Sequence, residues 1–175
     1  MYRDQIAEAL KGHDAEYIEF RLEESEASSI QYRGRELEDF NQSTSLGGNA
    51  RALVKGGWGF ISFNDLSNLR DKVKLAVKQA ELVGRDVTKF APAAPVVDSM
   101  EAVVGKDLAS FPSAEKKRLL DEYNEVIWST PKVETSIIGY RDRLRRVIFA
   151  NSGGSYIEQK NGDLSLRLSL IHISE

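Results

Sequence analysis

Cysteine is absent from this 175-residue chain, which excludes a disulfide framework and any chemistry that needs a thiol. No stretch approaches the roughly 18 consecutive apolar residues of a membrane-spanning helix. The first residues lead into an amphipathic helical pattern instead of the apolar core of a signal peptide. These absences predict a cytoplasmic chain without a membrane partner.

Histidine is almost as scarce, since only His13 and His172 occur. A catalytic zinc ion needs about three protein ligands, usually histidines with a carboxylate or cysteine. Two histidines at opposite ends of the chain offer no such spacing, and neither stands in a Ser-His-Asp arrangement. We therefore expect no metal site, no other cofactor and no catalytic residue within this sequence.

Positive charge is not in excess either. The formal net charge is −3 and the isoelectric point is near 5.6, which argues against general nucleic-acid binding. The one basic cluster, residues 141–146, is interrupted by Asp142, and we interpret it as a solvated hairpin tip between strands at 133–140 and 147–150. A minority interpretation is that its arginines bind a partner subunit or an anionic group.

Hydrophobic periodicity predicts the elements that are present. Helices are expected at 2–10, at 65–83 with Asn64 or Asp65 as its N-cap, and at 113–128. Alternation predicts strands at 17–23, 28–32 and 36–45, and three later strands separated by turns at 142–143 and 151–154, with a further turn signal at 161–162. The fold class is α+β, a mostly antiparallel sheet with two long amphipathic helices and a short N-terminal helix. Prolines predict an extended connection over 85–104.

The most informative segment is the glycine-punctuated stretch from Gly47 to Leu66. It predicts a hairpin, with strands at 50–54 and 58–63 and a turn of positive φ at 55–57. The spacing fits neither a P-loop nor a dinucleotide-binding loop. We assign Gly56, Gly57 and Gly59 to turn and bulge geometry. Packing roles on alternate faces are assigned to Trp58, Phe60 and Phe63, so that Phe60→Ala would cost about 3–5 kcal/mol. Arg51 is expected to brace the hairpin against Glu19, Glu23 or Asp65.

This hairpin, the strand at 17–23, the helix that follows the hairpin and the later segment 149–156 together resemble the N-terminal region of the TldD/PmbA family. Its members are cytoplasmic two-domain zinc metallopeptidases that were once described as modulators of DNA gyrase. The resemblance covers residues 1–168. The family-motif positions, expected to be mainly structural or to form a cleft, are Gly48, Arg51, Gly56, Gly59, Phe60 and Ser62.

The resemblance implies that residues 1–168 are an N-terminal domain whose catalytic C-terminal domain is missing. The family's His-Glu-x-x-x-His motif is not in this chain, so zinc is expected in the missing domain and the fragment is expected to be inactive alone. Residues 169–175 look like translated adapter sequence and are expected to be a non-native tail.

The function implied is to help form the cleft that admits unfolded peptide, by addition of a peptide strand to the sheet, and to contact a homo- or hetero-dimer partner of the same family. One alternative is an assembly module of the family's non-catalytic subunit. Another is an unrelated α+β binding domain whose glycine hairpin matches by chance.

Overall fold

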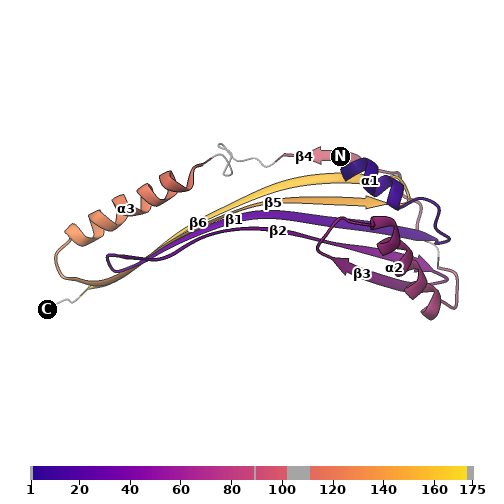
Figure 1. The fold of residues 1–175 in the computed structure, drawn as a ribbon, viewed down its shortest axis with the longest axis horizontal. Helices are drawn as coiled ribbons and strands as arrows, with labels where there is room; N and C mark the ends of the chain where they lie inside the picture. Colours follow the sequence, from indigo (N-terminus) through magenta and orange to yellow (C-terminus); the bar gives the residue numbers. More distant parts are fainter. Residues whose placement is uncertain (1, 89, 102–110, 173–175) are drawn as a thin grey trace. The chain divides into compact units, whose positions relative to one another are not determined.

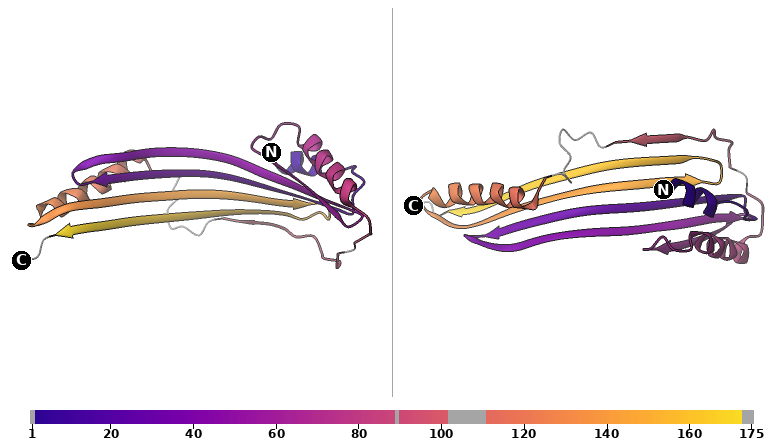
Figure 2. Two further views of the ribbon diagram at one scale, coloured as in Figure 1. Left: turned by 90° about the horizontal axis from the view of Figure 1, so that it is seen from below. Right: turned by 45° about the horizontal axis from the view of Figure 1, so that its top comes forward.

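The computed structural model describes residues 2–88, 90–101 and 111–172. Its elements, in chain order, are α1 (Tyr2–Ala9), β1 (Tyr17–Arg33), β2 (Glu36–Val54), β3 (Gly57–Phe63), α2 (Leu69–Val83), β4 (Val97–Met100), α3 (Ser113–Ser129), β5 (Val133–Asn151) and β6 (Tyr156–His172). The strands form one six-stranded sheet in the order β3-β2-β1-β5-β6-β4 (Figures 1 and 2). The predicted class, an α+β fold with a mostly antiparallel sheet, is confirmed.

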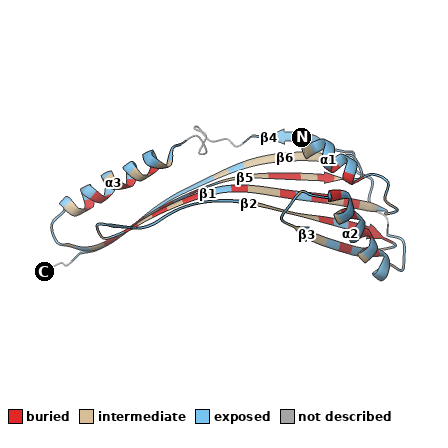
Figure 3. Ribbon diagram, viewed as in Figure 1, coloured by how far each residue is buried: buried red, intermediate tan, exposed pale blue. Residues whose placement is uncertain are grey.

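Two compact units share these strands. The first contains Met1–Glu24, Ser45–Glu101 and Arg146–Lys160, and the second contains Ser25–Thr44, Ala102–Arg145 and Asn161–Glu175. Each has its own apolar core (Figure 3). We describe the two units separately.

The core of the first unit lies between α1, α2 and one face of β1, β2 and β5. Alternation along β1 buries Ile18, Phe20 and Leu22 on this face, as the sequence predicts. From α2 the core receives Leu69, Val73, Ala76, Val77 and Ala80. Val83 was also expected there, but its side chain is 60% exposed because it lies in the last turn of the helix.

The start of α2 differs from the prediction. The helix begins at Leu69, four residues later than expected, after Asn68 in a left-handed conformation with φ of 50°. Asp65 does not cap it. Its carboxylate accepts hydrogen bonds from Lys72 Nζ, at 2.6 Å, and from Ser67, which together lower its pKa to about 2. Asp65 therefore holds the loop that precedes the helix. At the other end, Gly84 donates its N–H to Ala80 O at 2.9 Å, as expected of the C-cap.

The second unit packs α3 on β1 and β5. Leu120 and Ile127 contact a group formed by Ile30, Tyr32, Ile138 and Tyr140. The predicted helix bounds agree with the structure to within one residue, but Leu119, Tyr123 and Val126, which were expected to be buried, are exposed. Lys116 and Asn124 occupy buried positions instead.

Several predicted strand breaks are wrong. The expected strands at 36–45 and 50–54 form one strand, β2, and the expected turn at 142–143 lies inside β5. The Asn161-Gly162 signal lies inside β6. Pairing with long neighbouring strands satisfies the backbone here and overrides local turn propensity. The turn at Asn151–Gly154 is confirmed. The connection at 85–104 contains the short strand β4, and part of it lies outside the described residues.

Candidate functional site

The predicted hairpin is present in the first unit. β2 and β3 pair antiparallel with Arg51 opposite Phe60, Ala52 opposite Gly59 and Val54 opposite Gly57. Lys55 and Gly56 form the turn, with φ of 47° and 74° respectively. Two consecutive positive φ angles are typical of the tight turns that match the twist of a hairpin. Gly56 therefore has the turn role assigned to it, and Lys55 rather than Gly57 provides the other left-handed residue.

Gly59 has a different role from the one predicted. A β-carbon built on Gly59 would lie 2.6 Å from Ala80 N and closer still to Ala76 O, both in the backbone of α2. The absence of a side chain lets α2 lie directly on β3. Gly48 is constrained in a similar way, because its β-carbon would lie 2.9 Å from Arg21 O and would overlap the ring of Phe63. Close approach explains both glycines, and at Gly59 it replaces the predicted turn or bulge role.

Phe60 is exposed, contrary to the packing role predicted for it. Its side chain is 53% exposed, and that of Trp58 is 43% exposed. Both lie on the sheet face that points away from α2, because Gly57, Gly59 and Ile61 point toward the helix. We call this side of β1, β2 and β3 the outer face. It carries Glu19, Arg21, Asn49, Arg51, Trp58, Phe60 and Ser62.

Arg51 is braced as predicted, and its partner is Glu19. Arg51 Nε donates to Glu19 Oε1 at 2.6 Å, and a terminal nitrogen of the same guanidinium lies 2.5 Å from that oxygen. The guanidinium carbon lies 5.1 Å from the ring centre of Trp58. A guanidinium at this distance over an indole gains a cation–π attraction. The motif arginine is therefore fixed between an acid on β1 and an aromatic ring on β3.

Two cavities open on the outer face. One, of about 370 Å³, is lined by Gly48, Phe60 and Ser62 together with Arg21, Glu23 and Asn49. The other, of about 450 Å³, is lined by Arg51, Glu19 and Trp58 together with Tyr17 and Phe90. The structure thus brings three of the six motif positions, Arg51, Phe60 and Ser62, to the outer face. Gly48 borders the smaller cavity, but its β-carbon position points to the opposite face, toward Phe63. Gly56 lies in the turn and Gly59 lies under α2.

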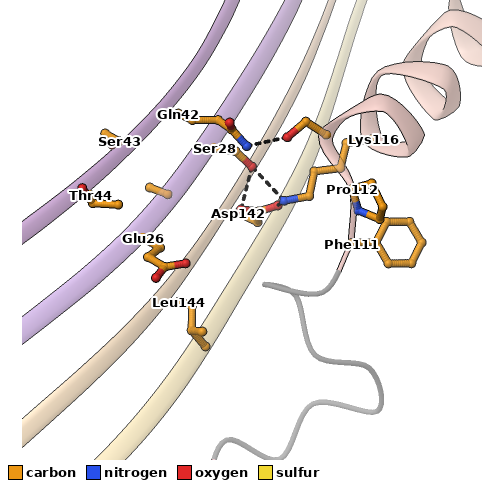
Figure 4. Close-up of a pocket in the computed structure, with 12 residues that line it drawn as sticks. Glu26, Ser28, Gln42, Ser43, Thr44, Phe111, Pro112, Lys116, Asp142 and Leu144 are labelled. Atoms are coloured by element: carbon orange, nitrogen blue, oxygen red, sulfur yellow. Dashed lines mark hydrogen bonds and ion pairs between the residues drawn. The ribbon is translucent and has the colours of Figure 1, made fainter.

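The second unit has a polar cavity of about 410 Å³, between the start of α3 and the strands β1, β2 and β5 (Figure 4). Lys116 and Asp142 meet here with only 6% and 7% of their side chains exposed and with 2.5 Å between Nζ and Oδ2. Ser28 Oγ donates to Asp142 Oδ1 at 2.7 Å, and Lys116 Nζ donates to Ser28 Oγ at 3.0 Å. Tyr140 also donates to the carboxylate, at 2.5 Å.

Hydrogen bonds and a neighbouring charge keep the Asp142 carboxyl ionised. Burial tends to raise the pKa of Asp142, but the hydrogen bonds from Lys116, Tyr140 and Ser28 and the charge of Lys116 outweigh it and leave the pKa below its usual value. Burial and the hydrogen bond to Asp142 raise the pKa of Tyr140. Because the Asp142 carboxylate already accepts hydrogen bonds from Ser28, Tyr140 and Lys116, and Lys116 comes from α3, we assign the group to anchoring α3 on the sheet.

The expected hairpin tip at 141–146 is therefore wrong. Asp142 is buried within β5, and Arg146, in the first unit, binds Glu158 at 2.6 Å and Glu24 at 3.2 Å. Sequence reasoning missed Asp142 because it was counted with the basic residues around it. A signal was available, since Ser136, Ile138, Tyr140 and Asp142 are spaced by two and are all buried.

Among the described residues, no three side chains of His, Cys, Asp or Glu lie together in a way that could hold a metal ion. His13 Nε2 lies 2.9 Å from Ala9 O at the end of α1. The described residues do not fit a zinc centre. No described helix is long and apolar enough to cross a membrane.

Comparison with known proteins gives a consistent result. Residues 18–80 match the family model for the PmbA/TldA metallopeptidase domain 1, and residues 106–175 match the model for the central domain of the same family. A metalloprotease of Synechocystis is 36% identical over 157 residues, which are 89% of this chain and 34% of the relative. A metalloprotease of Methanothermobacter thermautotrophicus is 28% identical over 156 residues, which are 89% of this chain and 34% of that protein.

Among solved structures, a candidate modulator of DNA gyrase from Thermotoga maritima has the same fold. Its TM-score is 0.80 at 15% identity, over 99% of this chain and 40% of the other. The present chain spans about a third of the length of the curated relatives that it matches. Two models of one family together match more than half of the chain. The chain belongs to the PmbA/TldD family of metallopeptidases.

Proposed function

We propose that this chain is the N-terminal, peptide-binding part of a PmbA/TldD metallopeptidase subunit, and that it does not cleave peptides alone. The zinc ligands would belong to the remaining two-thirds of a full-length subunit. The observation that carries the proposal is the outer edge of β6, the edge that faces away from β5. β4 pairs with Tyr156–Gln159 only, and no other described strand pairs with the rest of that edge.

The edge has the features of a site for an added strand. Tyr156 N donates to Val96 O at 2.8 Å, so its N–H points toward the outer edge. Successive N–H groups of a strand point to opposite edges, which puts the N–H groups of Leu164, Leu166 and Leu168 on the same outer edge. The side chains of these leucines are 54%, 46% and 54% exposed and share one face. An extended peptide would gain main-chain hydrogen bonds along the edge and apolar contacts at every second residue.

The test is a pair of substitutions at Leu166. Leu166→Pro removes the outward N–H, and proline is tolerated on a sheet edge. Leu166→Ala removes most of the apolar side chain and keeps the N–H. The probe is a fluorescein-labelled, blocked ten-residue peptide of alternating valine and lysine. Its binding is measured by fluorescence anisotropy, and mass spectrometry shows whether the peptide has been cleaved.

We expect Leu166→Ala to weaken binding of the peptide about threefold, because it removes apolar contact. Leu166→Pro should weaken it about tenfold, because it also removes an edge hydrogen bond that contributes roughly 1 kcal/mol. Equal affinity of the proline variant and the unmodified chain would refute edge pairing. Cleaved probe would refute the claim that the chain is inactive alone. Concentration-dependent dimerisation lost in Leu166→Pro, with no peptide binding in either protein, would instead support an assembly module.

A further inference from the structure

The larger cavity on the outer face has an aromatic lining drawn from distant parts of the chain. Tyr17 comes from the first residue of β1, Trp58 from β3, and Phe90 from the irregular segment between α2 and β4. We call these three rings, with Arg51 and Glu19 beside them, the aromatic pocket. Its volume of about 450 Å³ lies within the usual range of ligand sites.

The rings meet mainly by their edges. Tyr17 is nearly perpendicular to Phe90, with 5.1 Å between ring centres and an interplanar angle of 77°, and to Trp58, at 6.3 Å and 80°. Trp58 and Phe90 are 6.0 Å apart at 48°. An edge-to-face contact covers a face of only one of its two rings, and offset or perpendicular contact is the arrangement that another aromatic ring prefers. Trp58 and Phe90 remain 43% and 51% exposed, so an incoming group can cover them.

Charge in the pocket is balanced. Glu19 accepts a hydrogen bond from Arg51 Nε at 2.6 Å and lies 2.5 Å from a second guanidinium nitrogen. The positive charge of Arg51 therefore balances the negative charge of Glu19. The guanidinium already occupies the cation–π position near Trp58, at 5.1 Å. A cationic ligand would meet the charge of Arg51, and an anionic one would meet that of Glu19. The electrostatics therefore favour an uncharged occupant.

Phe90 gives direct evidence of what the rings accept. It stands in a segment without helix or strand, two residues before Pro92, and its phenyl ring packs on Tyr17 and Trp58. The aromatic lining thus already holds one phenyl group from irregular chain. A cavity remains beside it, lined by the same three rings.

We propose that the aromatic pocket binds one uncharged apolar side chain of a polypeptide, with a preference for an aromatic ring, and so gives the chain a sequence preference. This inference rests on the proposed peptide-binding function. Phe90 is a wall of the pocket, and Arg51 with Glu19 is the neutral support that holds Trp58. The outer edge of β6 supplies sequence-independent affinity, and the pocket selects a side chain.

The two tryptophans make the proposal measurable, because Trp58 lines the pocket and Trp128 lies in the second unit. The experiment records the indole N–H signals of the ¹⁵N-labelled 175-residue chain by NMR, assigned with Trp128→Phe. The probes are the blocked tripeptides Ac-Gly-Phe-Gly-NH2, Ac-Gly-Ala-Gly-NH2, Ac-Gly-Lys-Gly-NH2 and Ac-Gly-Asp-Gly-NH2. They are too short to pair along a strand edge, so they test the pocket apart from the edge.

We expect the phenylalanine probe to shift the Trp58 signal in a saturable way, with a dissociation constant on the order of millimolar, and to leave Trp128 unchanged. The other probes should shift Trp58 at least fivefold less at the same concentration. Phe90→Ala, which alters an exposed residue of an irregular segment, should weaken the phenylalanine probe about three- to tenfold. Leu82→Ala, at a position 85% exposed on α2, is the matched control and should change nothing.

Three results would overturn the proposal: no saturable shift of Trp58, a lysine probe as effective as phenylalanine, or tighter binding after Phe90→Ala, which would make Phe90 a plug. Leu166→Pro should leave the tripeptide titration unchanged. If the proline variant keeps full affinity for the ten-residue peptide while the tripeptide still binds at Trp58, edge pairing fails and the pocket stands. If the proline variant loses affinity for the ten-residue peptide while the phenylalanine tripeptide does not shift Trp58, the pocket is refuted and edge pairing stands.

Discussion

Gly59 offers the sharpest test of how the motif works. In Gly59→Ala the new methyl group would lie 2.6 Å from Ala80 N and closer to Ala76 O. Both atoms belong to the helix backbone, so no side-chain rotation relieves the overlap, and α2 has to move off β3. The residues that move with it, Val73, Ala76 and Ala80, are fully buried.

Overpacking of a well-packed core costs about 1–3 kcal/mol, and more when backbone has to shift. We expect Gly59→Ala to lower the free energy of unfolding by about 3 kcal/mol, the upper end of that range. Urea unfolding followed by Trp58 fluorescence in a Trp128→Phe background measures it, because Trp58 is next to Gly59 in the strand.

Gly47→Ala is the matched control for this experiment. Its β-carbon would meet only Phe63 O, at 4.0 Å, which is ordinary contact. The substitution should change the free energy of unfolding by less than about 0.5 kcal/mol. Equal unfolding midpoints for Gly59→Ala and Gly47→Ala would refute the argument that close helix approach requires Gly59.

Two further predictions concern residues whose roles the structure changed. Phe60→Ala should cost only about 1 kcal/mol in urea unfolding, because the ring is 53% exposed and full burial of such a side chain contributes about 1.5–3 kcal/mol; a loss near 4 kcal/mol would restore the packing role. Lys116→Met should cost about 3–5 kcal/mol at pH 7, since it leaves the Asp142 carboxylate buried without its cation, and adding Asp142→Asn should recover much of the loss. The folded pKa of Asp142 is below the unfolded value of about 3.9, so its stabilisation is present above that pH and is lost as the pH falls through the folded pKa. The difference between wild type and Lys116→Met should therefore narrow below about pH 4, and a constant difference from pH 7 to pH 3 would contradict the ion-pair account.

Much of the fold could be predicted from local signals. Alternation at Ile18, Phe20 and Leu22 identified the core face of β1, and the Lys55-Gly56 pair identified the hairpin turn. Pro112 and Pro131 bracket α3, whose predicted bounds were nearly correct. The glycine spacing identified the family, which the two family models confirm.

Other features depend on elements that are distant in sequence. A period of two says which residues share a face of a strand, but it does not say which face another element covers. The sequence therefore left Phe60 and Gly59 on opposite faces without revealing that α2 lies on the side of Gly59. It also placed Asp142 among arginines without revealing Lys116 from α3 as its partner.

The sequence by itself determined the helix and strand types, the hairpin and the family, because those depend on neighbours within a few residues. Only the tertiary structure decided that Phe60 and Trp58 are exposed, that Asp142 is buried, and that Tyr17, Trp58 and Phe90 share one pocket. The physical reason is that burial and pairing are set by contacts between segments tens of residues apart, and local propensity carries no record of those contacts.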